Sequence, residues 1–130
     1  METDEYQHLE LALRMFEEAE ECIKKEDAVQ ASEKLYKASE EALKVLATRF
    51  RLREYEEAEK RSRWTTTLLF GAVRRLSEIK PEIINLWDHA WTLHVEGFHE
   101  ARLILEDVKE RVKFIEELVR LAKEMGELEG

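Results

Sequence analysis

Helix-breaking residues are nearly absent from this chain. Only four of its 130 residues are Gly and one is Pro, and apolar residues recur every three or four positions instead of alternating. This spacing lines apolar side chains along one face of an α-helix, so the sequence predicts an all-α fold. We expect a single domain over residues 1–130, an antiparallel helical bundle of four to five main helices with a short connector helix.

The composition is that of a soluble globular protein, with 44% hydrophobic and 39% charged residues. Cys22 is the one cysteine, which excludes an intramolecular disulfide and a zinc site built from several thiolates. The start METDEYQ does not resemble a signal peptide, and no apolar run approaches the roughly 18 to 20 residues that span a bilayer. We therefore expect a cytoplasmic protein without membrane contact. One Asn and two Gln beside many Glu, Lys and Arg suggest heat adaptation.

Charge is distributed unevenly along the chain. The net charge of -9 disfavours strong binding to nucleic acid, because contact with phosphates relies on clustered Lys and Arg. Residues 1–27 carry ten acids and three bases, whereas residues 61–80 carry five bases and one acid. Any anion site should therefore lie in the second of these segments.

The periodicity places the individual helices. A first helix over about 4–25 and a second one beginning at Asp27 should form a tight hairpin, because small residues recur along the second helix and let two helix axes approach closely. The charged run 51–63 indicates a short exposed connector helix. Further helices are expected over 65–79, over 81–95, with Gly97 ending this helix in the left-handed conformation, and over 100–125.

Both terminal helices carry more apolar surface than one bundle core requires. In the first helix, a strip that includes His8, Leu11 and Met15 lies beside the main apolar face, and the last helix likewise has a second strip that includes Ile104 and Phe114. We therefore predict a homodimer formed through the first and last helices.

The segment from Trp87 to Arg102, WDHAWTLHVEGFHEAR, holds three of the four histidines. His89, His94 and His99 are five residues apart, a spacing that turns each ring by roughly 140° from the last on an ideal helix. We expect that the three rings cannot all converge, and that His94 lies among the aromatic residues of the core. The pattern Glu-x-x-His, used by di-iron bundles, occurs twice, but Gly97 interrupts one copy and His8 lies near a helix start. We predict no metal and no cofactor.

The basic segment offers the strongest candidate for anion binding. The helix that begins at Thr65 would present backbone N–H groups to an anion, next to arginines of the connector. The alternative, which we favour, is that glutamates of the connector pair with these arginines on a solvated surface. The candidate residues are Arg61, Arg63, Thr65 and Thr66. Motifs for a Ser or Cys nucleophile and for a phosphate-binding P-loop are missing from the sequence.

Three segments resemble the archaeal PaREP family, which is placed with HEPN-like helical domains (higher eukaryotes and prokaryotes nucleotide-binding). They are DAVQASEKLYKASEEALKVLA, REYEEAEKRSRWTTTLLFGAV and WDHAWTLHVEGFHEARL, and the likeness extends from about residue 4 to 122. The resemblance implies a bundle of four main helices with short connectors that is often dimeric. It also implies comparison with HEPN ribonucleases, which use Arg, a spacer of four to six residues and His.

That ribonuclease motif is missing here, because His94 and His99 precede Arg102 in place of following an Arg at the required spacing. We therefore expect a non-enzymatic helical dimerisation or interaction module, with a nucleotide or a protein as its partner. The alternative is a HEPN-type ribonuclease or RNA-associated protein acting at the dimer groove. Its remaining catalytic candidates would be His99, Arg102 and His94.

Overall fold

The computed structural model describes the backbone of residues 2–129 and the side chains of residues 4–125. Every regular element in the described chain is a helix, as predicted, and the short connector helix is present as the third element. The elements are α1 (Glu2–Lys24), α2 (Ala28–Arg49), α3 (Arg53–Arg61), α4 (Thr66–Ile79), α5 (Glu82–Thr92), the π-helix η1 (Leu93–His99) and α6 (Leu105–Glu129).

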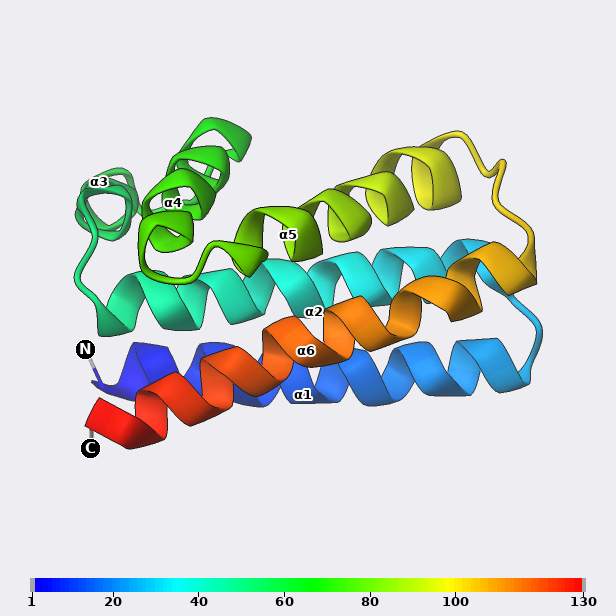
Figure 1. Ribbon diagram of the computed structural model, residues 1–130, viewed down its shortest axis with the longest axis horizontal. Coiled ribbons are helices and arrows are strands. Elements are labelled where there is room, and N and C mark those ends of the chain that lie inside the picture. Colours follow the sequence, from blue (N-terminus) through cyan, green and yellow to red (C-terminus); the bar gives the residue numbers. More distant parts are fainter. Residues whose placement is uncertain (1, 130) are drawn as a thin grey trace.

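The long helices α1, α2 and α6 lie side by side, and α5 with η1 runs along the other side of α2 (Figure 1). The helices α3 and α4 pack at the end of the bundle where both chain ends lie. The turn between α1 and α2 and the link between η1 and α6 lie at the opposite end. Among the described residues, no helix is long and apolar enough to cross a membrane.

Small residues account for the α1–α2 hairpin. Ala12 and Ala19 of α1 and Ala31, Ala38 and Ala42 of α2 are completely buried. A methyl side chain keeps the two helix axes close, and alanine has the best helix propensity, so one residue type serves both the helices and their contact. The hairpin turn is fixed by Asp27, whose carboxylate accepts a hydrogen bond of 3.0 Å from the backbone N–H of Gln30.

Helix α2 is the centre of the core. Its leucines are fully buried against side chains from α5, η1 and α6, and each such burial stabilises the fold by about 1.5–3 kcal/mol. Because α2 is covered on several sides, its remaining polar residues lie in narrow strips between neighbouring helices. The fully buried large apolar residues are Leu35, Leu43, Leu46, Leu76, Ile83, Leu93, Ile115 and Leu118.

Two predicted features of the last third of the chain are wrong. Gly97 does not adopt a left-handed conformation, and the residue with positive φ is Ala101, at 52°. Gly97 is instead needed for close approach, because a Cβ there would lie 2.2 Å from Ser32 Oγ in α2. The final helix begins at Leu105 and not near residue 100, since the preceding segment is non-helical, and the Asp107 carboxylate accepts a bond of 3.3 Å from Ile104 N–H.

Candidate functional site

The π-helix η1 brings His94 and His99 together. Its backbone bonds span five residues or more, as in Glu100 N–H to Val95 C=O at 2.8 Å, so residues five apart face the same side. The two Nε2 atoms lie 3.1 Å apart, with the ring planes at 81°. The three rings do not all converge, since His89 stacks on Phe114 elsewhere, but the rotation of roughly 140° expected on an α-helix does not hold between His94 and His99.

A carboxylate from α2 completes this group of side chains. Glu33 Oε1 lies 3.1 Å from His94 Nδ1, and both side chains are largely buried. An ionised carboxylate can only accept, so His94 donates its Nδ1 hydrogen to Glu33 and leaves its Nε2 lone pair directed at His99. His99 is exposed, so the chain Glu33–His94–His99 leads from the helix contact to solvent.

Aromatic packing holds the His94 ring in place. Tyr36 stacks on it with ring centroids 4.0 Å apart, and Trp91 lies 5.2 Å away. Burial raises the pKa of Tyr36 well above its usual range, and the charges of Glu40 and Glu33 act in the same direction. Tyr36 is therefore a neutral packing surface at neutral pH and not a base.

An open cleft of about 500 Å³ lies beside His94. It runs between α1 and α2 and reaches the start of α4 at Thr66. Three glutamates and one lysine line it, so it favours cationic over anionic ligands. Its lining residues are Leu11, Met15, Glu33, Tyr36, Lys37, Glu40, Glu41, Thr66 and His94.

Arg102 does not join this group. Its Nε lies 3.0 Å from Glu96 and its Nη2 lies 3.5 Å from Glu100, and these two carboxylates occupy the guanidinium. The arginine also follows η1 in a non-helical segment instead of standing on a helix with His99. The pairing of His99 with Arg102 on adjacent turns of one helix start, considered for an RNA-cleaving site, therefore has no basis in this backbone.

The other two histidines lie elsewhere. His89 stacks on Phe114 of α6 with ring centroids 3.7 Å apart, and His8 Nδ1 lies 2.7 Å from Glu41 Oε1 in α2. The histidines of the two Glu-x-x-His segments have different partners, Glu41 for His8 and His94 for His99. Within the described residues, no group of three or more His, Cys, Asp or Glu side chains is arranged to hold a metal ion.

The candidate anion-binding residues are not gathered into one site. Arg61 pairs with Glu57 at 3.1 Å, in agreement with the favoured alternative, and Arg63 is exposed. The Thr65 hydroxyl itself accepts from Leu68 N–H at 3.2 Å, so the first turn of α4 is capped by its own side chain. Thr66 instead lines the cleft beside His94.

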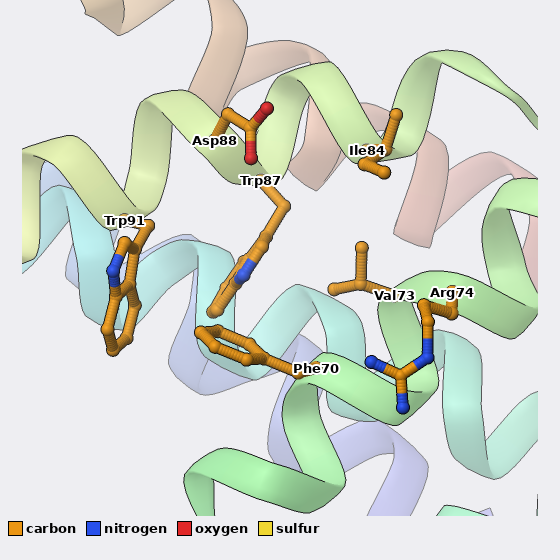
Figure 2. Close-up of a pocket in the computed structure, with 7 residues that line it drawn as sticks. All are labelled: Phe70, Val73, Arg74, Ile84, Trp87, Asp88 and Trp91. Carbon is orange, nitrogen blue, oxygen red and sulfur yellow. The ribbon is translucent and has the colours of Figure 1, made fainter.

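A second cleft, of about 330 Å³, opens between α4 and α5 (Figure 2). Its wall is an aromatic cluster in which Phe70 meets Trp91 edge-on at 4.9 Å and Trp87 at 6.2 Å. Arg74 extends along the cleft from α4, while Asp88 stands on α5 (Figure 2). We call this feature the aromatic cleft, and its remaining lining residues are Val73 and Ile84.

Two polar groups of the aromatic cleft lack partners among the described residues. Trp87 is 4% exposed and its buried Nε1–H meets no hydrogen-bond acceptor. Leaving such a donor unpaired costs about 1–3 kcal/mol. Arg74 has no carboxylate within ion-pair distance, because Glu54 pairs with Arg75 at 3.0 Å.

The outer face of α1 and α6 carries exposed apolar residues. Tyr6 is 71% exposed and Leu13 is 39% exposed. Leu13 borders a groove of about 370 Å³ between the two helices, with Phe16 and Val119 at its floor. The groove rim carries both charges, from Lys113, Glu116, Glu117, Arg120 and Lys123.

Sequence reasoning identified the histidines but missed their partners. Glu33 and His94 are 61 positions apart, and no local pattern joins them. The five-residue spacing of His94 and His99 was itself the available signal, because it is the hydrogen-bond period of a π-helix. Arg74 and Trp87 were missed because nothing in the sequence shows that a buried indole lacks an acceptor.

Comparison with known proteins places the chain in a family. Residues 7–119 match the archaeal PaREP1/PaREP8 family. A crystal structure from Sulfolobus solfataricus, structural-genomics target SsR10, is 43% identical, covers 88% of this chain and 94% of its own, and has a TM-score of 0.82. The solution structure of target SsR10, Orf c02003 protein, is also 43% identical, covers 86% and 88%, and has a TM-score of 0.77. A search of curated proteins gave no match. The chain therefore belongs to the archaeal PaREP1/PaREP8 family.

Proposed function

We propose that this protein is a non-enzymatic helical module that binds a nucleotide in the aromatic cleft between α4 and α5. The observation that carries the proposal is the aromatic wall of that cleft, formed by Phe70, Trp87 and Trp91, beside the guanidinium of Arg74. An anionic group of a ligand would give the Arg74 guanidinium the ion-pair partner that it lacks among the described residues. Aromatic walls with a few polar groups are typical of small-molecule sites.

The lining of the cleft defines the ligand. The rings of Phe70, Trp87 and Trp91 provide flat apolar surfaces on which a nucleobase stacks. Arg74 supplies a guanidinium for a phosphate, and Asp88 supplies an acceptor for a hydroxyl or amino group. The volume of about 330 Å³ suits a base and sugar, with phosphates reaching solvent. The net charge of -9 favours a single nucleotide over a nucleic acid.

Tryptophan fluorescence and thermal shift test this function with AMP, ATP, adenosine and inorganic phosphate. We expect AMP and ATP to quench fluorescence and raise the melting temperature. Arg74→Ala should weaken nucleotide binding without changing adenosine binding, and Trp87→Phe, which reduces the aromatic surface of the cleft, should weaken both by up to about tenfold. Arg63→Ala, which removes an exposed arginine outside the cleft, serves as the matched control. Unchanged fluorescence and melting at millimolar nucleotide would refute the proposal.

We also propose that two copies pair through the outer face of α1 and α6. Exposed Tyr6 and Leu13 next to a groove with rim charges of both signs support this arrangement, because a two-fold axis can set lysines of one copy against glutamates of the other. Light scattering coupled to gel filtration should give a dimer mass for the native chain and a monomer mass for Leu13→Glu. Ile79→Glu, which changes an exposed apolar residue of α4, is the control and should leave the mass unchanged.

The HEPN-like relationship remains part of this proposal and rests on the sequence resemblance. A ribonuclease of that kind is the alternative function. The occupation of Arg102 by Glu96 and Glu100 counts against it. Incubation with mixed RNA decides between them: cleavage that disappears in His99→Ala would establish the enzyme, and intact RNA supports the binding module.

A further inference from the structure

The His94 and His99 rings bring two nitrogen atoms close together next to solvent. Their Nε2 atoms lie 3.1 Å apart, with the ring planes at 81°. In a tetrahedral site with Zn–N bonds of about 2.0–2.1 Å, two imidazole nitrogens lie roughly 3.3 Å apart. The pair therefore already has nearly the spacing that a shared divalent ion requires.

The surroundings of His94 match those of a metal-bound imidazole. Metal-ligating histidines usually donate their other ring N–H to a carboxylate, which fixes the tautomer and orients the ring. Glu33 Oε1 fills this role at 3.1 Å from His94 Nδ1. Tyr36 stacks on the same ring at 4.0 Å, so His94 is held in position without the ion.

The site would be open to further ligands. No third His, Cys, Asp or Glu in the described part of the chain completes the coordination. The nearest acid of η1, Glu96, pairs with Arg102 at 3.0 Å. His99 is exposed, and the cleft of about 500 Å³ reaches His94. Water or external ligands can therefore occupy the remaining two positions of a tetrahedral ion, one more than the single open position of catalytic zinc sites.

We propose that His94 and His99 bind one divalent transition-metal ion, of the Zn²⁺ type, through their Nε2 atoms, with Glu33 as the positioning residue behind His94. Imidazole ligands favour zinc, cobalt, nickel and copper over Mg²⁺ and Ca²⁺, which prefer oxygen ligands. This site is separate from the aromatic cleft, since neither His94 nor His99 lines that cleft. The proposal therefore stands independently of nucleotide binding.

Calorimetric titration of untagged, chelator-treated full-length protein tests the proposal with Zn²⁺ and Co²⁺. We expect one ion per chain, a raised melting temperature, and no binding of Mg²⁺. His99→Ala changes an exposed residue, so it keeps the fold and should abolish binding. The matched controls His89→Ala and His8→Ala remove histidines with other partners and should leave affinity unchanged.

Glu33 is tested by two variants. Glu33→Ala should weaken Zn²⁺ binding by about 10- to 100-fold, and Glu33→Gln, which still accepts from Nδ1–H, should restore most of the affinity. Histidine resonances should show Zn²⁺-dependent shifts for His94 and His99 and not for His8. No binding at millimolar Zn²⁺, or binding that survives His99→Ala, would overturn the proposal and leave a carboxylate–histidine–histidine hydrogen-bond chain without an ion.

Discussion

Helix α2 carries two carboxylate–histidine pairs whose surroundings differ. Glu41 lies 2.7 Å from His8, and Glu33 lies 3.1 Å from His94. Glu41 also accepts a bond of 2.9 Å from Lys44, so its charge is matched inside the bundle. The same two residue types therefore form a closed ion-pair network in one place and an open candidate site in the other.

The backbone of the histidine's own element causes the difference. His8 stands on the regular helix α1, where a residue five positions away is rotated by roughly 140° and faces another side. His94 stands on η1, whose wider turn puts His99 beside it. The open site therefore depends on the packing of η1 against α2. A change at that contact should displace the Glu33–His94 pair and leave the Glu41–His8 pair in place.

The largest expected effect follows from Gly97→Ala. The new Cβ would lie 2.2 Å from Ser32 Oγ and 2.6 Å from Ser32 Cβ. These atoms are close to the α2 backbone and cannot swing aside, so we expect a loss of about 3 kcal/mol in the free energy of unfolding. Urea denaturation measures it. The Glu33–His94 pair should be displaced, while the Glu41–His8 pair remains.

Gly71→Ala is the matched control for this variant. Its Cβ would meet Glu54 Oε2 at 2.8 Å and Glu54 Cγ at 3.0 Å, which belong to a flexible side chain. Alanine also gains roughly 0.5–1 kcal/mol of helix stability over glycine. The loss should therefore stay below about 1 kcal/mol. Equal losses for the two variants would contradict a specific tight contact between η1 and α2.

The sequence predicts the helices more reliably than their ends. Periodicity and the small residues of α2 lead directly to the bundle and the α1–α2 hairpin. The start of α6 is not predictable from pattern, because residues 100–104 have helical composition but follow a π-helix. The role of Gly97 likewise depends on Ser32, a residue of another helix that periodicity does not place opposite it.

Glu41→Gln should give the second-largest effect. The side chains of Glu41 and Lys44 are 10% and 13% exposed, so removing the carboxylate charge leaves a nearly buried ammonium with Glu40 as its remaining partner. We expect a loss of about 2 kcal/mol in the free energy of unfolding. Glu33→Gln should lose less than about 1 kcal/mol, because the amide oxygen still accepts from His94. A larger loss for Glu33→Gln than for Glu41→Gln would contradict the view that Glu41 belongs to the closed ion-pair network and Glu33 to the open site.

Acid unfolding tests the ion-pair network of Glu41 in a second way. Burial raises the pKa of Glu41, but the hydrogen bonds from His8 and Lys44 outweigh it and leave the pKa below its ordinary value of 4.5. A lowered folded-state pKa stabilises the protein at pH values above the unfolded-state pKa, and this contribution is lost as the pH falls through the folded-state value. Glu41→Gln should therefore lose less stability than the native chain between pH 6 and pH 3, as measured by melting temperature.

The candidate site was only partly predictable. His94 among aromatic rings follows from helical spacing, and its contacts with Tyr36 and Trp91 confirm that placement. The convergence of His94 with His99 does not follow, because the choice of a π-helix is made by the packing of η1 on α2. Glu33 is one of many glutamates in the sequence. Its contact with His94 is visible only in the folded chain.

The smallest expected effect concerns His89, the histidine of α5 that faces α6. Partial burial lowers its pKa below the ordinary value of 6.5, and the charges of Arg111 and Lys113 act in the same direction against Asp88. As the pH falls, the unfolded chain therefore protonates His89 at a higher pH than the folded chain does. The stability that is present above pH 6.5 is lost as the pH falls through the lowered folded-state pKa of His89. His89→Phe keeps a ring against Phe114, which His89 stacks on at 3.7 Å, and should show a smaller drop in melting temperature between pH 7.5 and pH 5.5. Asp88→Asn removes the opposing charge and should enlarge the drop, whereas identical pH profiles for all three proteins would show that His89 titrates alike in the folded and unfolded states.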